Sequence, residues 1–386
     1  MQQTQSNGFV RFLRSFNGQQ TLGNSRFFWC AWLVVVVLLV LLPFFGSRYQ
    51  VITASNFLIS SILALSLCLI WGYCGILSLG QAAFYCIGGY AYGIVAMNLI
   101  EAHGNTDLAI LAGMVAPAIF AALLGFLMFY SRLKGVYVAI LMLVTSLLLG
   151  LFMRQTADPS YVIGSAYLGG MNGLSPAKAS DPSLPNIILG LGESVFEFDG
   201  RGREFYWLVL AVGVLVYLGL RWIVNSSFGY VLVAVREDPE RAETFGYDVR
   251  LVQLGVFCLS AAIAGLAGTL YTAWGTYIHP DGFSVAANIL VVIWVAVGGR
   301  KDLTSVIVST VALNWISIEL STLGEISMLA LGCILVVAMM AAPEGVVSGL
   351  GQAIGRLIKK PAATKAKINS QPPAHSFGLP KVERTP

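Results

Sequence analysis

The residue types that most often carry out covalent chemistry are few in this sequence and widely separated. The three histidines, His103, His279 and His375, lie in loops or in the C-terminal tail, and no HExxH, GxSxG or GxxxxGK[ST] motif is present. The six cysteines fall in or beside apolar stretches, without the paired spacing of metal ligands. The sequence therefore favours a protein that is not an enzyme, that needs no metal or cofactor, and that does not itself cradle ATP phosphates.

Uncharged polar side chains could instead line a path for a solute. The stretch WGYCGILSLGQAAFYCIGGYAYG (71–93) is rich in glycine, which permits breaks in a membrane helix, and broken helices often line substrate paths. Six side chains are candidates for such a lining: Ser78, Gln81, Tyr85, Asn98, Trp294 and Asn314. They would suit a small, hydrogen-bonding solute that is uncharged or zwitterionic. Close packing of helices through small and polar residues, and a place for the Trp in the interfacial belt, are the alternatives.

The composition indicates which elements must position these groups. The chain of 386 residues is 57% hydrophobic and 11% charged, with a mean hydropathy of +0.77, which is outside the usage of soluble domains. Apolar runs of about 20 residues recur, and each would span roughly 30 Å as a helix, the thickness of the hydrocarbon core. The sequence predicts an all-α, polytopic membrane protein with about ten transmembrane helices, at 27–46, 51–70, 82–100, 108–130, 135–153, 205–223, 251–275, 287–299, 303–321 and 326–342.

The distribution of lysine and arginine orients these spans. Arg132, Lys134, Arg300 and Lys301 fall on the same side as the termini, so the positive-inside rule places both termini in the cytoplasm. The net charge of +4 then lies where anionic lipid headgroups are, and no nucleic-acid-binding motif accompanies it. The predicted organisation is a cytoplasmic N-terminal segment (1–26), a transmembrane domain (27–350) with an external loop (154–204) and a cytoplasmic loop (225–250), and a disordered basic tail (351–386).

The cytoplasmic loop contains the stretch VREDPERAETFGYD (235–248), in which seven side chains are ionisable. Asp238 suits an N-cap, Pro239 the first helical position and Gly246 the left-handed residue that ends a helix, so a short helix over 239–245 is predicted. Ala242 and Phe245 would share one face of it. The charged residues around that face are Glu240, Arg241 and Glu243. This pattern predicts an apolar knob with a charged rim that enters a partner's socket; a solvated loop is the alternative.

Several stretches resemble one family of transport proteins. Residues 240–246, ERAETFG, look like the EAA-type coupling loop of ABC importer permeases, with Arg241 in place of the usual first alanine. The stretches LSLGQAAF (77–84), RLKGVYVAIL (132–141) and GGMNGLS (169–175) are similar to permeases of the branched-chain amino acid type. VIWVAVGGR (292–300) looks more like the urea-transport branch, although the following KDLTSVIVSTVALNW departs from the family's usual glycine-rich continuation.

The resemblance implies a multi-pass protein of the bacterial inner membrane that works with other subunits. A second homologous permease subunit, two cytoplasmic ATP-binding subunits and a periplasmic substrate-binding protein would complete an ATP-driven importer. The solute would be urea or a short amide, with a branched-chain amino acid as the alternative. A secondary carrier or channel is a further alternative, although Glu319 is the only clear carboxylate inside a predicted span, whereas ion-coupled carriers usually hold several ionisable residues there.

Overall fold

The computed structural model describes residues 20–21, 26–133, 135–178, 181–191 and 194–321, together with the single positions 332 and 349. Within these ranges eight helical stretches are long and apolar enough to cross a bilayer, which confirms the prediction of an all-α, polytopic membrane protein. The ends of the nine predicted spans that fall in this part of the chain agree with helix ends to within three residues. The tenth predicted span, 326–342, and the tail 351–386 lie outside the described residues.

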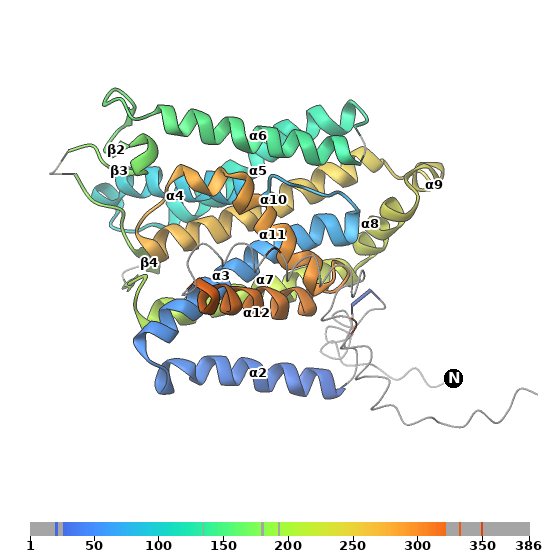
Figure 1. Cartoon of the computed structure of the whole chain (residues 1–386), viewed down its shortest axis with the longest axis horizontal. Helices are drawn as coiled ribbons and strands as arrows, with labels where there is room; N and C mark the ends of the chain where they lie inside the picture. The colour runs from blue at the N-terminus through green and yellow to red at the C-terminus, as the bar shows by residue number, and fades with distance from the viewer. Residues whose placement is uncertain are drawn as a thin grey trace, which may run out of the picture.

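The helices run roughly side by side across the molecule (Figure 1). The long ones are α2 (Arg26–Phe45), α3 (Arg48–Leu67, continued by the π-helix η1, Cys68–Tyr73), α4 (Gln81–His103), α5 (Asp107–Tyr130), α6 (Val136–Gln155), α7 (Arg203–Asn225), α10 (Val249–Gly275) and α12 (Leu303–Ser321). The shorter ones are α8 (Ser227–Glu237), α9 (Pro239–Thr244), α11 (Val285–Gly298) and the 3-10 turns η2 (Gly170–Asn172) and η3 (Pro280–Phe283). With its 14 residues, α11 is shorter than a full membrane crossing.

The connection between α6 and α7 contains the described strands, at the end of the bundle opposite to α9 (Figure 1). Strands β1 (Val162–Ile163), β2 (Ala166–Tyr167) and β3 (Ser175–Pro176) form one small antiparallel sheet, and β4 (Ile187–Leu191) pairs with β5 (Ser194–Phe198) in a hairpin. The predicted external loop therefore has local structure of its own.

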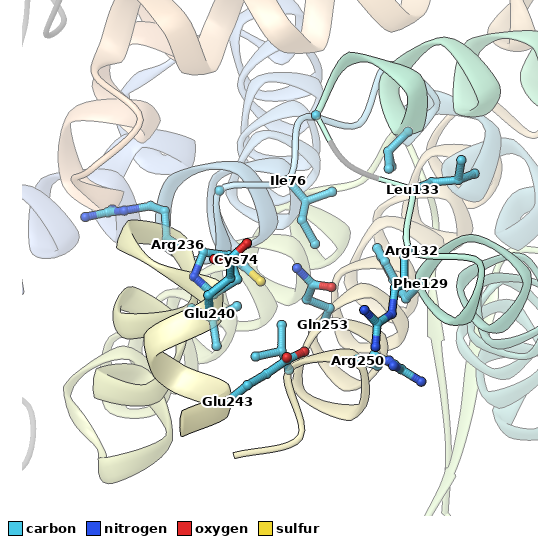
Figure 2. A pocket seen from close by; sticks show the side chains of 16 residues that line it. Cys74, Ile76, Phe129, Arg132, Leu133, Arg236, Glu240, Glu243, Arg250 and Gln253 are labelled. Carbon is cyan, nitrogen blue, oxygen red and sulfur yellow. The ribbon is translucent and has the colours of Figure 1, made fainter. Parts of the chain in front are cut away.

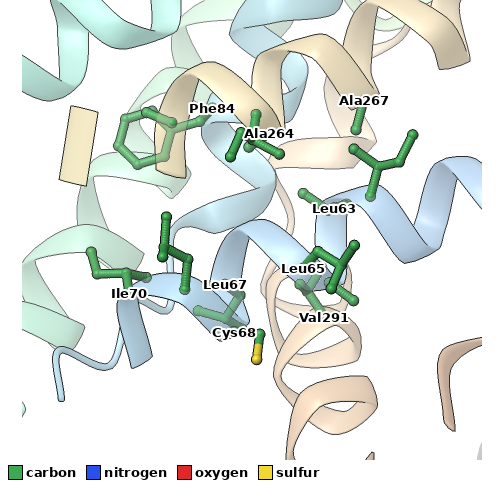
Figure 3. Close-up of a cluster of buried hydrophobic side chains, with 14 of the residues drawn as sticks. Leu63, Leu65, Leu67, Cys68, Ile70, Phe84, Ala264, Ala267 and Val291 are labelled. Atoms are coloured by element: carbon green, nitrogen blue, oxygen red, sulfur yellow. The ribbon is translucent and has the colours of Figure 1, made fainter. Parts of the chain in front are cut away.

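Helix α10 is the centre of the packing, with α3, α4 and α5 against it (Figure 1). Three glycines allow α4, α5 and α10 to approach closely: a Cβ added at Gly88 would lie 2.4 Å from Cα of Gly265 and 2.7 Å from the carbonyl oxygen of Gly113. Around this crossing, aliphatic and aromatic side chains such as Leu67 and Phe84 form the main apolar cluster (Figure 3). Small residues at a helix interface are the usual means of association in membranes, where close van der Waals contact replaces the hydrophobic effect.

Helix α2 lies at the edge of the bundle, and side chains of α7 hold it there (Figure 1). Arg221 of α7 is only 1% exposed, and its guanidinium lies 5.0 Å from the ring centre of Phe28 and 4.9 Å from that of Trp29. The guanidinium also donates to the hydroxyl of Tyr217, 2.9 Å away. A buried charge is costly in a membrane unless such partners surround it, so these contacts fix the position of α2 on α7.

Candidate functional site

We call residues 74–80, which connect the span formed by α3 and η1 to the span formed by α4, the helix break. Helix α3 continues through η1 to Tyr73, and α4 begins only at Gln81, with Gly80 in the N-cap position. A Cβ added at Gly80 would lie 2.6 Å from the carbonyl oxygen of Met142, which is the seventh residue of α6. At a rise of about 1.5 Å per residue, Met142 lies about 9 Å from the N-terminal end of α6, and the start of α4 is therefore about this far inside the bundle. The glycine-rich stretch thus contains a break that lies between two full-length spans and enters the bundle.

Side chains from distant parts of the sequence hold this break in place. The Nε2 atom of Gln81 donates to the hydroxyls of Ser66 and Ser260, at 2.8 Å and 2.9 Å. The backbone N–H of Ala82, in the first turn of α4, donates to Oδ1 of Asn288 on α11 at 3.1 Å. The first N–H groups of a helix lack partners within the helix, and Asn288 supplies one for Ala82, while the bonds of Gln81 tie the start of α4 to α3 and α10.

A cavity of about 330 Å³ lies beside the start of α4, between α3, α4, α10, α11 and α12. Its aliphatic and aromatic walls come from Leu63, Tyr85, Tyr271, Ile278, Leu290, Val291 and Trp294. Its polar groups come from Asn56, Ser60, His279, Asp281 and Asn314. Such a lining, mostly apolar with a few convergent polar groups, is typical of a small-molecule site.

Three of the six predicted lining residues, Tyr85, Trp294 and Asn314, come together in this cavity. Tyr85 stacks at a tilt against Tyr271, with ring centres 5.5 Å apart, and Trp294 is 6% exposed. The side-chain amide of Asn314 donates to the carbonyl oxygen of Thr310 at 2.8 Å, and the residue lines the cavity from α12. The residues are brought together from α4, α11 and α12.

The other three predicted lining residues, Ser78, Gln81 and Asn98, do not line this cavity. Ser78 is wholly buried in the break, and its hydroxyl accepts from the N–H of Gly80 at 3.4 Å. Gln81 is 1% exposed and binds Ser66 and Ser260, as described above. Asn98 accepts from the N–H of Ser165 at 2.9 Å and donates to the carbonyl oxygen of Ile163, so that it fastens the β1–β2 turn to α4. Each is used to hold structure.

The cavity also contains polar residues that the sequence reasoning missed. Asn56 and Ser60 lie four residues apart on α3, and this spacing of polar groups on one face of an apolar span is a signal that could have revealed them. At the rim, Asp281 pairs with Arg154 of α6 at 2.9 Å, and its carboxylate is 3.5 Å from Nδ1 of His279. His279 and Asp281 lie at the start of the turn η3, outside the spans, and could not be associated with them by periodicity.

At the opposite end of the bundle, the charged loop forms the predicted helix, α9. The side chain of Asp238 accepts from the N–H of Arg241 at 3.1 Å, Pro239 occupies the first turn, and Gly246 follows the helix with φ of +87°. Residue Phe245 is the C-cap, so the helix ends one residue earlier than predicted. The local sequence thus determines this helix through its two caps.

The predicted apolar knob is only partly as expected. Phe245 is 83% exposed, whereas Ala242 is 3% exposed and packs against Val235 and Val249 of α8 and α10. The expectation that both residues form one outward surface is therefore wrong for Ala242, which anchors α9 to its neighbours because it lies on the inner side of the turn. Of these two side chains, only that of Phe245 projects into solvent.

Between α9 and the bundle lies a second cavity, of about 410 Å³. Glu240 and Glu243 of α9 line one side, and Arg132 and Arg250 lie across from them (Figure 2). Cys74 and Ile76 of the helix break also line it (Figure 2). Helix α9 and the helix break therefore face the same space.

The described part of the chain is a multi-pass helical bundle with a helix break between two spans, a cavity lined by apolar and polar side chains, and a short helix capped at both ends, and these features would suit a transport protein. Among the described residues no group of three or more His, Cys, Asp and Glu side chains could hold a metal ion.

The comparisons with known proteins specify the class further. Residues 49–342 match the family described as "Branched-chain amino acid transport system / permease component". The chain belongs to this family.

The curated relatives are permease proteins from bacteria and an archaeon. The chain is 30% identical over 319 residues to the "High-affinity branched-chain amino acid transport system permease protein LivM" of Escherichia coli (strain K12), covering 81% of this chain and 73% of the relative. It is 29% identical over 326 residues to the protein of the same name from Salmonella typhimurium, with the same coverage. A "Probable branched-chain amino acid transport permease protein LivM" of Methanocaldococcus jannaschii is 24% identical over 248 residues, 58% of this chain and 67% of the relative. No solved structure matches the chain.

These findings confirm the ABC permease family of the branched-chain amino acid type and a multi-pass location in the inner membrane. The closer similarity to the urea branch finds no support in the relatives described above, whose names refer to branched-chain amino acid transport. Membership of the family also identifies the chain as a transport subunit.

Proposed function

We propose that this chain is one transmembrane subunit of an ATP-driven importer that carries branched-chain amino acids. The observation that carries the proposal is the family match over residues 49–342, which extends from α3 beyond the last described helix. The remaining partners would be a second permease subunit, two ATP-binding subunits and an external binding protein. In this arrangement α9 faces the cytoplasm and the strands β1–β5 face outward.

The chemistry of the cavity beside α4 supports an aliphatic amino acid over urea. Leu63, Ile278, Leu290 and Val291 contribute aliphatic surface, which would gain contact energy with a hydrocarbon side chain of the solute. Urea has no apolar part, so such walls would offer it nothing in return for its lost hydration. The amides, the hydroxyl and the charged rim of the same cavity provide donors and acceptors for the ammonium and carboxylate groups of a zwitterion.

The proposed transport role would give each end of the bundle a function. The cavity beside α4 would receive the solute from the binding protein, and Ser60 and Asn314 would contact it within the bundle. The surface formed by Glu240, Arg241, Glu243, Phe245 and Gly246 would contact an ATP-binding subunit, while Ala242 holds α9 in place. Hydrolysis would take place on that subunit, and this chain would alternate between two packings of its helices.

Uptake by cells that lack this subunit tests the substrate. Deletion of the chain should abolish binding-protein-dependent uptake of labelled leucine and leave urea uptake unchanged, and the wild-type gene should restore leucine uptake. Cells that lose urea uptake and keep leucine uptake would reverse the substrate proposal in favour of the urea branch.

A further inference from the structure

Arg236 lies two residues before the N-cap of α9 and extends from α8 to the helix break. Its Nη1 atom donates to the carbonyl oxygen of Gly72 at 2.5 Å, although 164 residues separate the two in the sequence. Its side chain also packs against Gly75, where an added Cβ would lie 2.6 Å from Cγ of Arg236. The side chain is 19% exposed, so most of its surface is used in these contacts.

The geometry of the break explains why the carbonyl of Gly72 is available. In an α-helix this oxygen would accept from the N–H of residue 76. Here the N–H of Ile76 donates instead to the carbonyl oxygen of Ile70, at 3.1 Å, because the chain leaves the π-helix η1 and turns at Gly75 with φ of +80°. The carbonyl of Gly72 therefore needs a donor from elsewhere, since an unpaired buried carbonyl is costly.

Glu237 fixes the orientation of the guanidinium. The Nε and Nη2 atoms of Arg236 donate to Oε1 of Glu237, at 3.1 Å and 2.6 Å, while Nη1 stays directed at Gly72. The side-chain hydrogen bonds from Arg236 hold the pKa of Glu237 below its usual value. The carboxylate is thus ionised throughout the physiological pH range, and the fork of the guanidinium is engaged on both sides.

We propose that Arg236 is the positioning residue that ties the ATPase-coupling helix α9 to the helix break, so that a displacement of α9 moves η1 and the start of α4. The proposal rests on the permease function proposed above and names the contact through which its two ends communicate. Asp238 caps α9 directly after α8, so α8 and α9 share a short, rigid connection. Beyond the break, the bond from Ala82 to Asn288 carries the displacement to α11, which lines the solute cavity.

A native cysteine, Cys74, allows this contact to be tested by thiol labelling in the assembled transporter. Cys74 is 3% exposed, lies directly after η1, and lines the cavity between the break and α9 together with Arg236 (Figure 2). If the break moves with α9, the rate at which a cytoplasmic maleimide labels Cys74 must depend on the nucleotide state. Peptide mass spectrometry distinguishes Cys74 from the other cysteines.

The experiment compares the intact complex in proteoliposomes, wild type and variant, without nucleotide and with trapped ATP. In the wild type we expect the Cys74 labelling rate to differ between the two states by about fivefold or more. In Arg236→Gln the two rates become equal and leucine uptake falls about tenfold, while ATP hydrolysis and subunit assembly persist. As a control, Lys301→Gln removes an exposed cation whose charge also acts on Glu237 but keeps the bond from Arg236 to Gly72, and it should behave as wild type.

If the Arg236→Gln complex does not assemble, two further variants test the role of Arg236. Arg236→Lys keeps the positive charge but loses the several donors of the guanidinium. Glu237→Gln removes the carboxylate that orients Arg236. Both variants should reduce the nucleotide dependence of Cys74 labelling. Nucleotide-dependent labelling of wild-type size in all assembled variants overturns the proposal, as does wild-type labelling that ignores nucleotide. A wild-type complex that shows nucleotide-dependent labelling but takes up no leucine contradicts only the substrate assignment.

Discussion

Truncation of Phe245 is the most direct test of the surface proposed to contact the ATP-binding subunit. The side chain is 83% exposed and lies at the end of α9, whereas the neighbouring Ala242 is buried against α8 and α10. Removing the ring therefore leaves the packing of the chain itself unchanged. Its effect should be confined to whatever covers this surface in the assembled transporter.

The exposed fraction sets the size of the expected effect. Full burial of a Phe side chain is worth about 1.5–3 kcal/mol, so burial of the exposed four-fifths by a partner is worth about 1.2–2.5 kcal/mol. The loss of this contact in Phe245→Ala corresponds to an affinity for the ATP-binding subunit that is about 8- to 70-fold lower. Phe245→Asp should weaken binding further, because it would bury an unpaired charge in the interface.

The affinity is measured by titrating the purified ATP-binding subunit onto permease in nanodiscs, alongside the stimulation of ATP hydrolysis by loaded binding protein. Phe196→Ala is the matched control, since this ring is 52% exposed on β5 at the opposite end of the molecule. It should bind the ATP-binding subunit with wild-type affinity. Wild-type affinity and stimulation in both Phe245 variants would refute the assignment of α9 and show that the segment is a solvated loop.

Two other variants test the interior. Gly88→Leu on α4 should reduce the yield and thermal stability of the folded subunit, because the side chain would meet backbone atoms of Gly265 and Gly113. Gly255→Leu on α10 should be tolerated, since no atom lies within 4 Å of a Cβ added there, and equal stability of the two variants in detergent would contradict the close crossing. Asn314→Leu should lower leucine uptake at saturating loaded binding protein by about 2- to 13-fold through the loss of one hydrogen bond, and an unchanged rate would exclude Asn314 from contact with the solute.

Local sequence accounts for the elements of this fold that depend only on neighbours in the chain. Apolar runs predict the spans because the bilayer thickness sets their length. The start and end of α9 follow from Asp238, Pro239 and Gly246, whose preferences act within a few residues. Neither result requires knowledge of what the helix packs against.

The assignment of polar residues to the cavity needs information that is distant in the sequence. Gln81 and Tyr85 are four residues apart on α4, yet Gln81 binds Ser260, 179 residues away, and only Tyr85 lines the cavity. Which of them faces the solute depends on the rotation of α4, and partners on α3 and α10 set this rotation. The link from Arg236 to Gly72 is likewise invisible in the sequence, because it depends on a carbonyl released by the π-helix.

The start of α4, next to the helix break, also contains a buried polar atom without a partner, which makes the observed packing of the break less stable. Among the described residues, Oε1 of Gln81 is buried without a hydrogen-bond partner, although its Nε2 is fully used. An unpaired buried oxygen raises the free energy of this packing by about 1–3 kcal/mol, comparable with the difference between the two states of a switch. A shift of the break that brings a donor to Gln81 would recover this energy, while the bond from Arg236 to Gly72 opposes such a shift for as long as α8 and α9 stay in place. In the transport cycle proposed above, the position of α9 would then decide which of two packings of the break is lower in free energy.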